Sequence, residues 1–113
     1  MTRVLVSKKQ RELQMVDGLM EFLYSIQHPE DKPIAKSLLD SLSKLTQDEV
    51  IDRILSIREI LKRHHPKGER LFRVLWREDP GSLGCAYGVY LMTGRPDLAV
   101  EECDVAYEHI RGF

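Results

Sequence analysis

The segment from Gly81 to Ile110 constrains the fold most, because it has the pattern of two helices joined by a tight turn. Small residues recur at helical spacing in both halves, and small residues let two helix backbones approach closely. Gly94 can adopt the left-handed conformation that ends a helix. Pro96 fits the first turn of the next helix, because its missing N–H would have no helical partner there. The segment therefore predicts a helical hairpin.

Apolar residues at helical spacing predict two helices in the first part of the chain. Ser7 is a candidate N-cap for a helix that reaches about Gln27. A polar loop with two prolines follows, and a second helix is expected from Pro33 to Leu45. The run at positions 4–6 fits either a short strand or an extension of the first helix, so residues 1–6 stay unassigned.

The middle of the chain carries a capping box, a pattern in which two side chains cap the first turn of a helix. Thr46 and Glu49 have the required spacing, so a third helix is predicted from Thr46 to about His64. A compact apolar segment from about Glu69 to Arg77 predicts a short additional helix. With the final hairpin, the expected fold is all-α. It is a small bundle of about five to six helices arranged as stacked helical hairpins, in a single domain over residues 1–113.

The first helix is apolar over an unusually wide arc. Its apolar residues between positions 13 and 26 cover roughly 200°, whereas a helix at the edge of one core needs little more than about 100°. The helix is therefore either central to the bundle or half of an interface. We expect the second, and we expect Phe22→Glu to stay folded but to lose association. The residues predicted to form the partner interface are Met15, Leu19, Phe22, Ile26, Tyr87 and Tyr90.

Composition limits the classes of partner and the compartment. The net charge of −1 gives no general attraction for nucleic acid or for an anionic membrane. The apolar runs are too short to span a membrane, and the first residues lack the apolar core of a secretory signal. A cytoplasmic protein is therefore expected. Cys85 and Cys103 fit small packing residues in a reducing compartment better than a disulfide.

No set of residues predicts a catalytic or metal site, and no cofactor is expected. The histidines and cysteines lack close metal-ligand spacing. Acidic residues of the last helix, such as Glu101 and Glu108, fit a solvated face better than a cation site. The basic segment 62–70 follows a predicted helix end, where positive side chains complement the helix dipole. The residues there that we expect to be structural rather than phosphate-binding are Lys62, Arg63, Lys67 and Arg70.

The final hairpin resembles a single tetratricopeptide repeat over residues 82–111. The residues at the spacings of that family's first-helix anchors, turn glycine and second-helix alanines are Leu83, Ala86, Tyr90, Gly94, Ala99 and Ala106. Tyr87 and Arg111 depart from the pattern, which has a small residue and a proline at these positions. The resemblance implies a protein-binding helical scaffold of the kind found in cytosolic adaptors and small chaperones.

Three classes of function remain open. The one we favour is a protein–protein interaction module without catalytic activity: an adaptor, a regulator or a small chaperone-like protein that binds another protein or itself as a homodimer. The second is a nucleic-acid-associated regulator that uses Lys8, Lys9, Arg11 and the basic segment 62–70. The third is a small helical enzyme whose polar site is assembled only in the fold. Salt dependence distinguishes the first two, because phosphate contacts weaken steeply with ionic strength.

Overall fold

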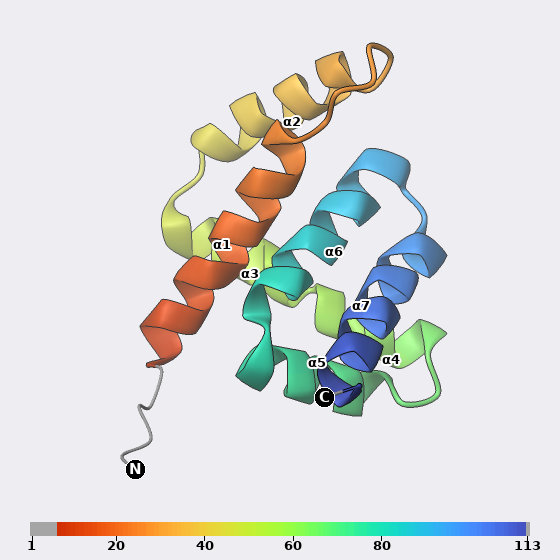
Figure 1. Cartoon of the computed structure of the whole chain (residues 1–113). Helices are drawn as coiled ribbons and strands as arrows, with labels where there is room; N and C mark the ends of the chain where they lie inside the picture. Colours follow the sequence, from red (N-terminus) through yellow and green to blue (C-terminus); the bar gives the residue numbers. More distant parts are fainter. Residues whose placement is uncertain (1–6, 113) are drawn as a thin grey trace.

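The structure is a computed structural model that describes residues 7–112 of the 113-residue chain. Over this range the chain forms seven helices and no strand, which confirms the all-α prediction (Figure 1). The helices are α1 (Lys8–Tyr24), α2 (Lys32–Ser43), α3 (Gln47–Leu55), α4 (Ile57–His64), α5 (Gly68–Glu78), α6 (Pro80–Thr93) and α7 (Pro96–Arg111). The undecided segment at residues 1–6 lies outside the described residues.

Two of the helix starts are fixed by capping boxes. Ser7 Oγ accepts a hydrogen bond from the Gln10 N–H at 3.1 Å, and Gln10 Oε1 accepts one from the Ser7 N–H at 3.4 Å. Thr46 and Glu49 make the same reciprocal pair at 3.2 and 2.9 Å at the start of α3. Each pair satisfies two backbone N–H groups that the first turn of a helix leaves without partners. Both predicted helix starts are confirmed.

Serine hydroxyls mark several helix ends, and they explain where the predicted boundaries were wrong. Ser25, Ser43 and Ser56 each donate from Oγ to the backbone carbonyl three residues earlier, at 2.6–2.7 Å. A side chain that binds this carbonyl competes with the helical hydrogen-bond ladder. The first helix therefore ends at Tyr24 rather than near Gln27, and the predicted third helix is divided at Ser56 into α3 and α4.

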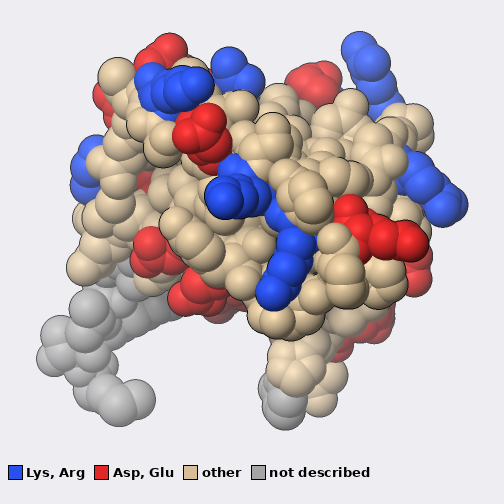
Figure 2. Space-filling view, turned by 90° about the horizontal axis from the view of Figure 1, so that it is seen from above, with Lys and Arg blue, Asp and Glu red and all other residues tan. Residues whose placement is uncertain are grey.

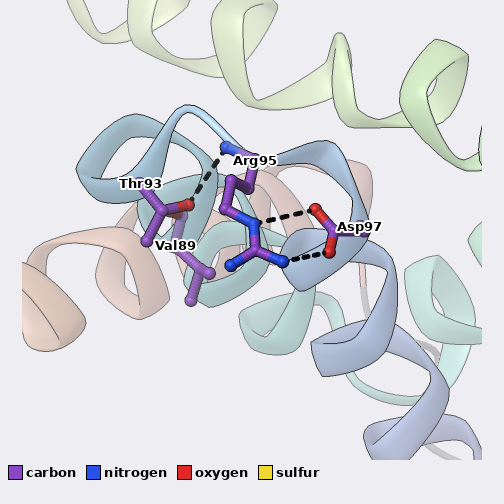
Figure 3. Close-up of polar contacts among 4 residues, drawn as sticks. All are labelled: Val89, Thr93, Arg95 and Asp97. Carbon is purple, nitrogen blue, oxygen red and sulfur yellow. Dashed lines mark hydrogen bonds and ion pairs between the residues drawn. The ribbon is translucent and has the colours of Figure 1, made fainter.

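The turn of the final hairpin has the predicted conformation (Figure 3). Gly94 has a φ of 66° and lies in the left-handed region, and its N–H binds the Tyr90 carbonyl at 2.7 Å. Thr93 Oγ1 donates to the Val89 carbonyl at 2.7 Å and accepts the Arg95 N–H at 3.2 Å. Arg95 also forms an ion pair with Asp97 at 2.7 Å. The turn that joins α6 to α7 is therefore held by both backbone and side-chain contacts.

The closest helix contact in the fold joins α1 to α6, which lie side by side and run in the same direction (Figure 1). A Cβ atom at Gly84 would overlap the Met15 carbonyl oxygen and lie 2.8 Å from the Leu19 nitrogen. A Cβ atom at Gly88 would lie 2.6 Å from the Phe22 ring. We expected the small residues of α6 to nest against α7. Helices α6 and α7 do pack as the predicted hairpin, with Ala86, Ala99 and Cys103 fully buried, but the glycines of α6 face α1.

This arrangement covers part of the wide apolar arc of α1. Besides α6, the helices α2 and α3 also pack against α1. Met15 and Leu19 are both 0% exposed, and Leu23 is 2% exposed. Phe22 is half-buried with its ring against Gly88. Helix α6, which packs against all six other described helices, is the central helix of the bundle, whereas α1 keeps Leu13 and Tyr24 exposed. That α1 takes part in association stays a prediction.

Candidate partner-binding groove

A small apolar groove opens between α2, α3 and α6, and we call it the α2–α6 groove. It has a volume of about 110 Å³. An engineered apolar cavity of about 150 Å³ holds benzene, so the groove suits the end of one bulky side chain. Its lining residues are Leu38, Ser41, Leu42, Leu45, Arg53, Tyr87 and Leu91.

The groove follows from apolar residues placed one turn apart on two helices. Leu38 and Leu42 lie on one face of α2, and Tyr87 and Leu91 lie on the facing side of α6. Leu42 is buried, whereas Leu38 and Leu91 are half-buried. Ile34 precedes Leu38 by one turn and is 44% exposed, so it extends the apolar stripe of α2 beyond the groove.

Tyr87 is the buried polar residue of the groove. Its side chain is 7% exposed, and its ring lies 6.4 Å from that of Tyr90. The hydroxyl makes no hydrogen bond with any residue between positions 7 and 112. Burial raises the pKa of Tyr87, while the positive charge of Arg53 acts in the opposite direction. The phenol is therefore protonated at neutral pH and can donate a hydrogen bond.

Arg53, on α3, carries the only charge among the described residues that line the groove. Its guanidinium forms no ion pair with another described residue. Its positive charge acts to lower the pKa of both Glu49 and Tyr87. The Glu49 carboxylate instead accepts the Thr46 N–H at 2.9 Å, and this backbone bond is the main reason that the pKa of Glu49 is lowered. The groove therefore presents two donors, one of them cationic, beside an apolar surface.

The predicted interface residues are divided among several places. Tyr87 lines the α2–α6 groove, with Tyr90 beside it. Phe22 borders a wider surface groove between α1 and α6, and Ile26 borders another between α1 and α2. Met15 and Leu19 are in the core, so a partner that meets the folded chain does not contact them. Their inclusion as surface residues is corrected by the packing of α6 over α1.

Sequence reasoning missed six residues of the groove: Leu38, Ser41, Leu42, Leu45, Arg53 and Leu91. A signal was present for the three leucines of the first region, because the stretch from Leu38 to Leu45 has more leucines than one buried stripe needs. Arg53 and Leu91 give no such signal. Their position beside α2 is a product of tertiary packing.

Part of the basic segment 62–70 is engaged within the chain. Lys62 lies 3.9 Å from Glu59, and His65 Nε2 lies 3.4 Å from Asp104. His65 Nδ1 also accepts the Lys67 N–H at 2.9 Å. In the view from above, basic and acidic side chains are interspersed (Figure 2). Lys62 and Arg63 lie in the last turn of α4, where positive side chains complement the helix dipole, whereas Lys67 and Arg70 lie at the start of α5.

Between positions 7 and 112, no group of three or more histidine, cysteine or acidic side chains is placed to hold a metal ion. None of the described helices combines the length and apolar character that crossing a membrane requires. Comparison with protein-family models gives no match, and comparisons with curated proteins and with solved structures give none either. The fold and the groove therefore define a small all-α bundle with a side-chain-sized apolar groove.

Proposed function

We propose that the chain is a non-catalytic, cytoplasmic protein-interaction module that binds a partner protein at the α2–α6 groove. The observation that carries the proposal is the groove itself, whose half-buried leucines remain accessible beside the exposed Ile34. Burying such apolar surface against a partner is favourable, and a pocket that receives one anchoring side chain is typical of an interface hot spot.

The size and chemistry of the groove favour a protein partner over a small metabolite. Its volume of about 110 Å³ lies well below the range of about 300–1,000 Å³ typical of small-molecule sites. Its lining is mostly leucine, with polar groups from Ser41, Arg53 and Tyr87. One side chain of a partner would fill it, while the rest of the partner would cover Ile34 and the outer face of α2.

Two serines on α2 provide a matched test. Ser41 lines the groove and is exposed, so Ser41→Trp should fill the groove without disturbing the core. Ser43 is also exposed but does not line the groove, so Ser43→Trp is the control. Circular dichroism should show the same helix content for both variants.

The wild type and both variants would be used as bait in host-cell extract, with chemical cross-linking before capture. We expect one species to be captured by the wild type and by Ser43→Trp but lost with Ser41→Trp. Sedimentation of the purified chain identifies a second copy of itself as the captured species. Equal capture by all three proteins, or none by any of them, would contradict the proposal.

A further inference from the structure

The α2–α6 groove offers hydrogen-bond donors that the chain itself leaves without an acceptor. Tyr87 is 7% exposed as a residue, and its hydroxyl, which solvent still reaches, makes no hydrogen bond with any described residue. The Arg53 guanidinium stands at the same groove without an ion pair in residues 7–112. Both groups are therefore free to donate to an acceptor that a partner brings to the groove.

The two donors line the same groove. The charge of Arg53 opposes the burial-driven rise in the pKa of Tyr87, so the guanidinium is within electrostatic reach of the phenol. Among residues 7–112, no acidic side chain lines the groove. An anionic acceptor there would gain hydrogen bonds from both donors and would meet no like charge among the lining residues.

The walls of the groove are two rows of apolar residues spaced by one helical turn. Leu38 and Leu42 form a ridge along α2, and Tyr87 and Leu91 form a ridge along α6. A third helix packs into the space between two such ridges and inserts apolar side chains spaced by one turn. Ile34 extends the α2 ridge toward the exposed end, where it can meet a second apolar residue of that helix.

We infer that the partner presents an acidic amphipathic helix, with one bulky apolar side chain in the α2–α6 groove and an aspartate or glutamate bound by Arg53 and Tyr87. This inference rests on the proposed function, because it specifies the chemistry of the partner for the same groove. The carboxylate accepts from a cationic donor and a neutral one, which is the kind of charge-assisted pair that fixes orientation.

The experiment uses a display library of random 16-residue peptides placed inside a carrier protein, so that no peptide has a free C-terminus. Peptides enriched on the wild-type chain would be synthesised with blocked ends and a fluorophore, and their binding measured by fluorescence anisotropy. We expect the enriched sequences to share an acidic residue within one helical turn of a bulky apolar residue. We also expect the bound peptides to be helical by circular dichroism.

Variants of the chain then test the two donors. Arg53→Gln should weaken binding by about tenfold or more, and Tyr87→Phe, which keeps the ring, should weaken it by about threefold or more. Arg63→Gln is the matched control, because Arg63 is exposed and does not line the groove. Replacing the acidic residue of the peptide by its amide should weaken binding to the wild type but have little further effect with Arg53→Gln.

The outcomes separate this inference from the proposed function. Peptides that bind in a manner sensitive to Ser41→Trp but insensitive to Arg53→Gln would overturn the carboxylate assignment and leave groove binding intact. Peptides that bind only with a free C-terminal carboxylate would overturn the acidic helix. If no enriched peptide is sensitive to Ser41→Trp, both the inference and the groove as a binding site fail.

Discussion

Replacing Gly84 by alanine tests the packing of α1 against α6 directly. The added methyl group would overlap the Met15 carbonyl oxygen and crowd the Leu19 nitrogen, and both are backbone atoms that cannot rotate away. The two helices must therefore move apart along a contact that includes fully buried residues. Overpacking of a core costs about 1–3 kcal/mol, and a backbone obstacle places this site at the upper end.

The change in the free energy of unfolding of Gly84→Ala also includes a stabilising contribution. Alanine is favoured over glycine inside a helix by about 1 kcal/mol. Subtracting this from about 3 kcal/mol leaves an expected loss of about 2 kcal/mol for Gly84→Ala. For a chain of this size that corresponds to a fall in melting temperature of about 8 °C.

Gly81 provides the matched control on the same helix. A Cβ atom there would lie 3.6 Å from the Gln14 carbonyl oxygen, which is an ordinary contact. Gly81→Ala should therefore leave the free energy of unfolding unchanged or raise it by up to about 1 kcal/mol. Urea denaturation followed by circular dichroism measures both variants. If Gly84→Ala proves as stable as Gly81→Ala, α1 and α6 are not as close as the structure places them, and the reasoning is refuted.

Three further predictions address the turn, a cap and the thiols. Gly94→Val should lower the free energy of unfolding by about 1–2 kcal/mol in urea denaturation, because valine is strained at this positive φ. A clash does not contribute, since no described atom lies within 4 Å of a Cβ at this position, and an unchanged midpoint would refute the prediction. The pKa of Glu49 in the folded chain is lowered, chiefly by its bond to the Thr46 N–H. The ionised carboxylate therefore adds stability that is fully present above pH 4.5, the value in the unfolded chain, and that is lost as the pH falls through the lowered pKa of the folded chain. Glu49→Gln keeps the cap, and its stability measured against pH should lack this component; identical pH profiles would count against the assignment. Burial raises the pKa of Cys85 to about 11 and that of Cys103 to about 12, so a thiol reagent at pH 8 should modify Cys85 slowly and Cys103 more slowly still; equal rates would contradict the packing.

Local signals predicted much of the fold because they depend on a few neighbouring residues. The caps at Ser7 and Thr46 and the turn at Gly94 each follow from side chains or conformations within one helical turn. The helical spacing of leucines and isoleucines gave the fold class for the same reason. Ser56 shows the limit of such patterns, because apolar spacing continues through it from Ile54 to Ile57, both 0% exposed, while the helix does not.

The groove could not be predicted because it depends on which helices meet. The small residues of α6 indicated a close helix contact but could not identify the partner helix, since α1 and α7 both had apolar faces to offer. Once α6 packs on α1, Tyr87 and Leu91 turn toward α2, and Arg53 comes to the same place from α3. The same packing leaves Met15 buried and Tyr90 half-buried, although the sequence predicted both to be interface residues.

The pairing of α1 with α6 also sets an order of events during synthesis. Met15 and Gly84 are about seventy residues apart in the chain, so a ribosome working at about 5–20 residues per second makes the second about 3 to 14 s after the first. Throughout that interval the broad apolar face of α1 has no α6 to cover it. The growing chain therefore passes through a stage in which the apolar face of α1 is exposed to any molecular chaperone or neighbouring nascent chain, and this stage ends only when residues beyond Gly88 have been added.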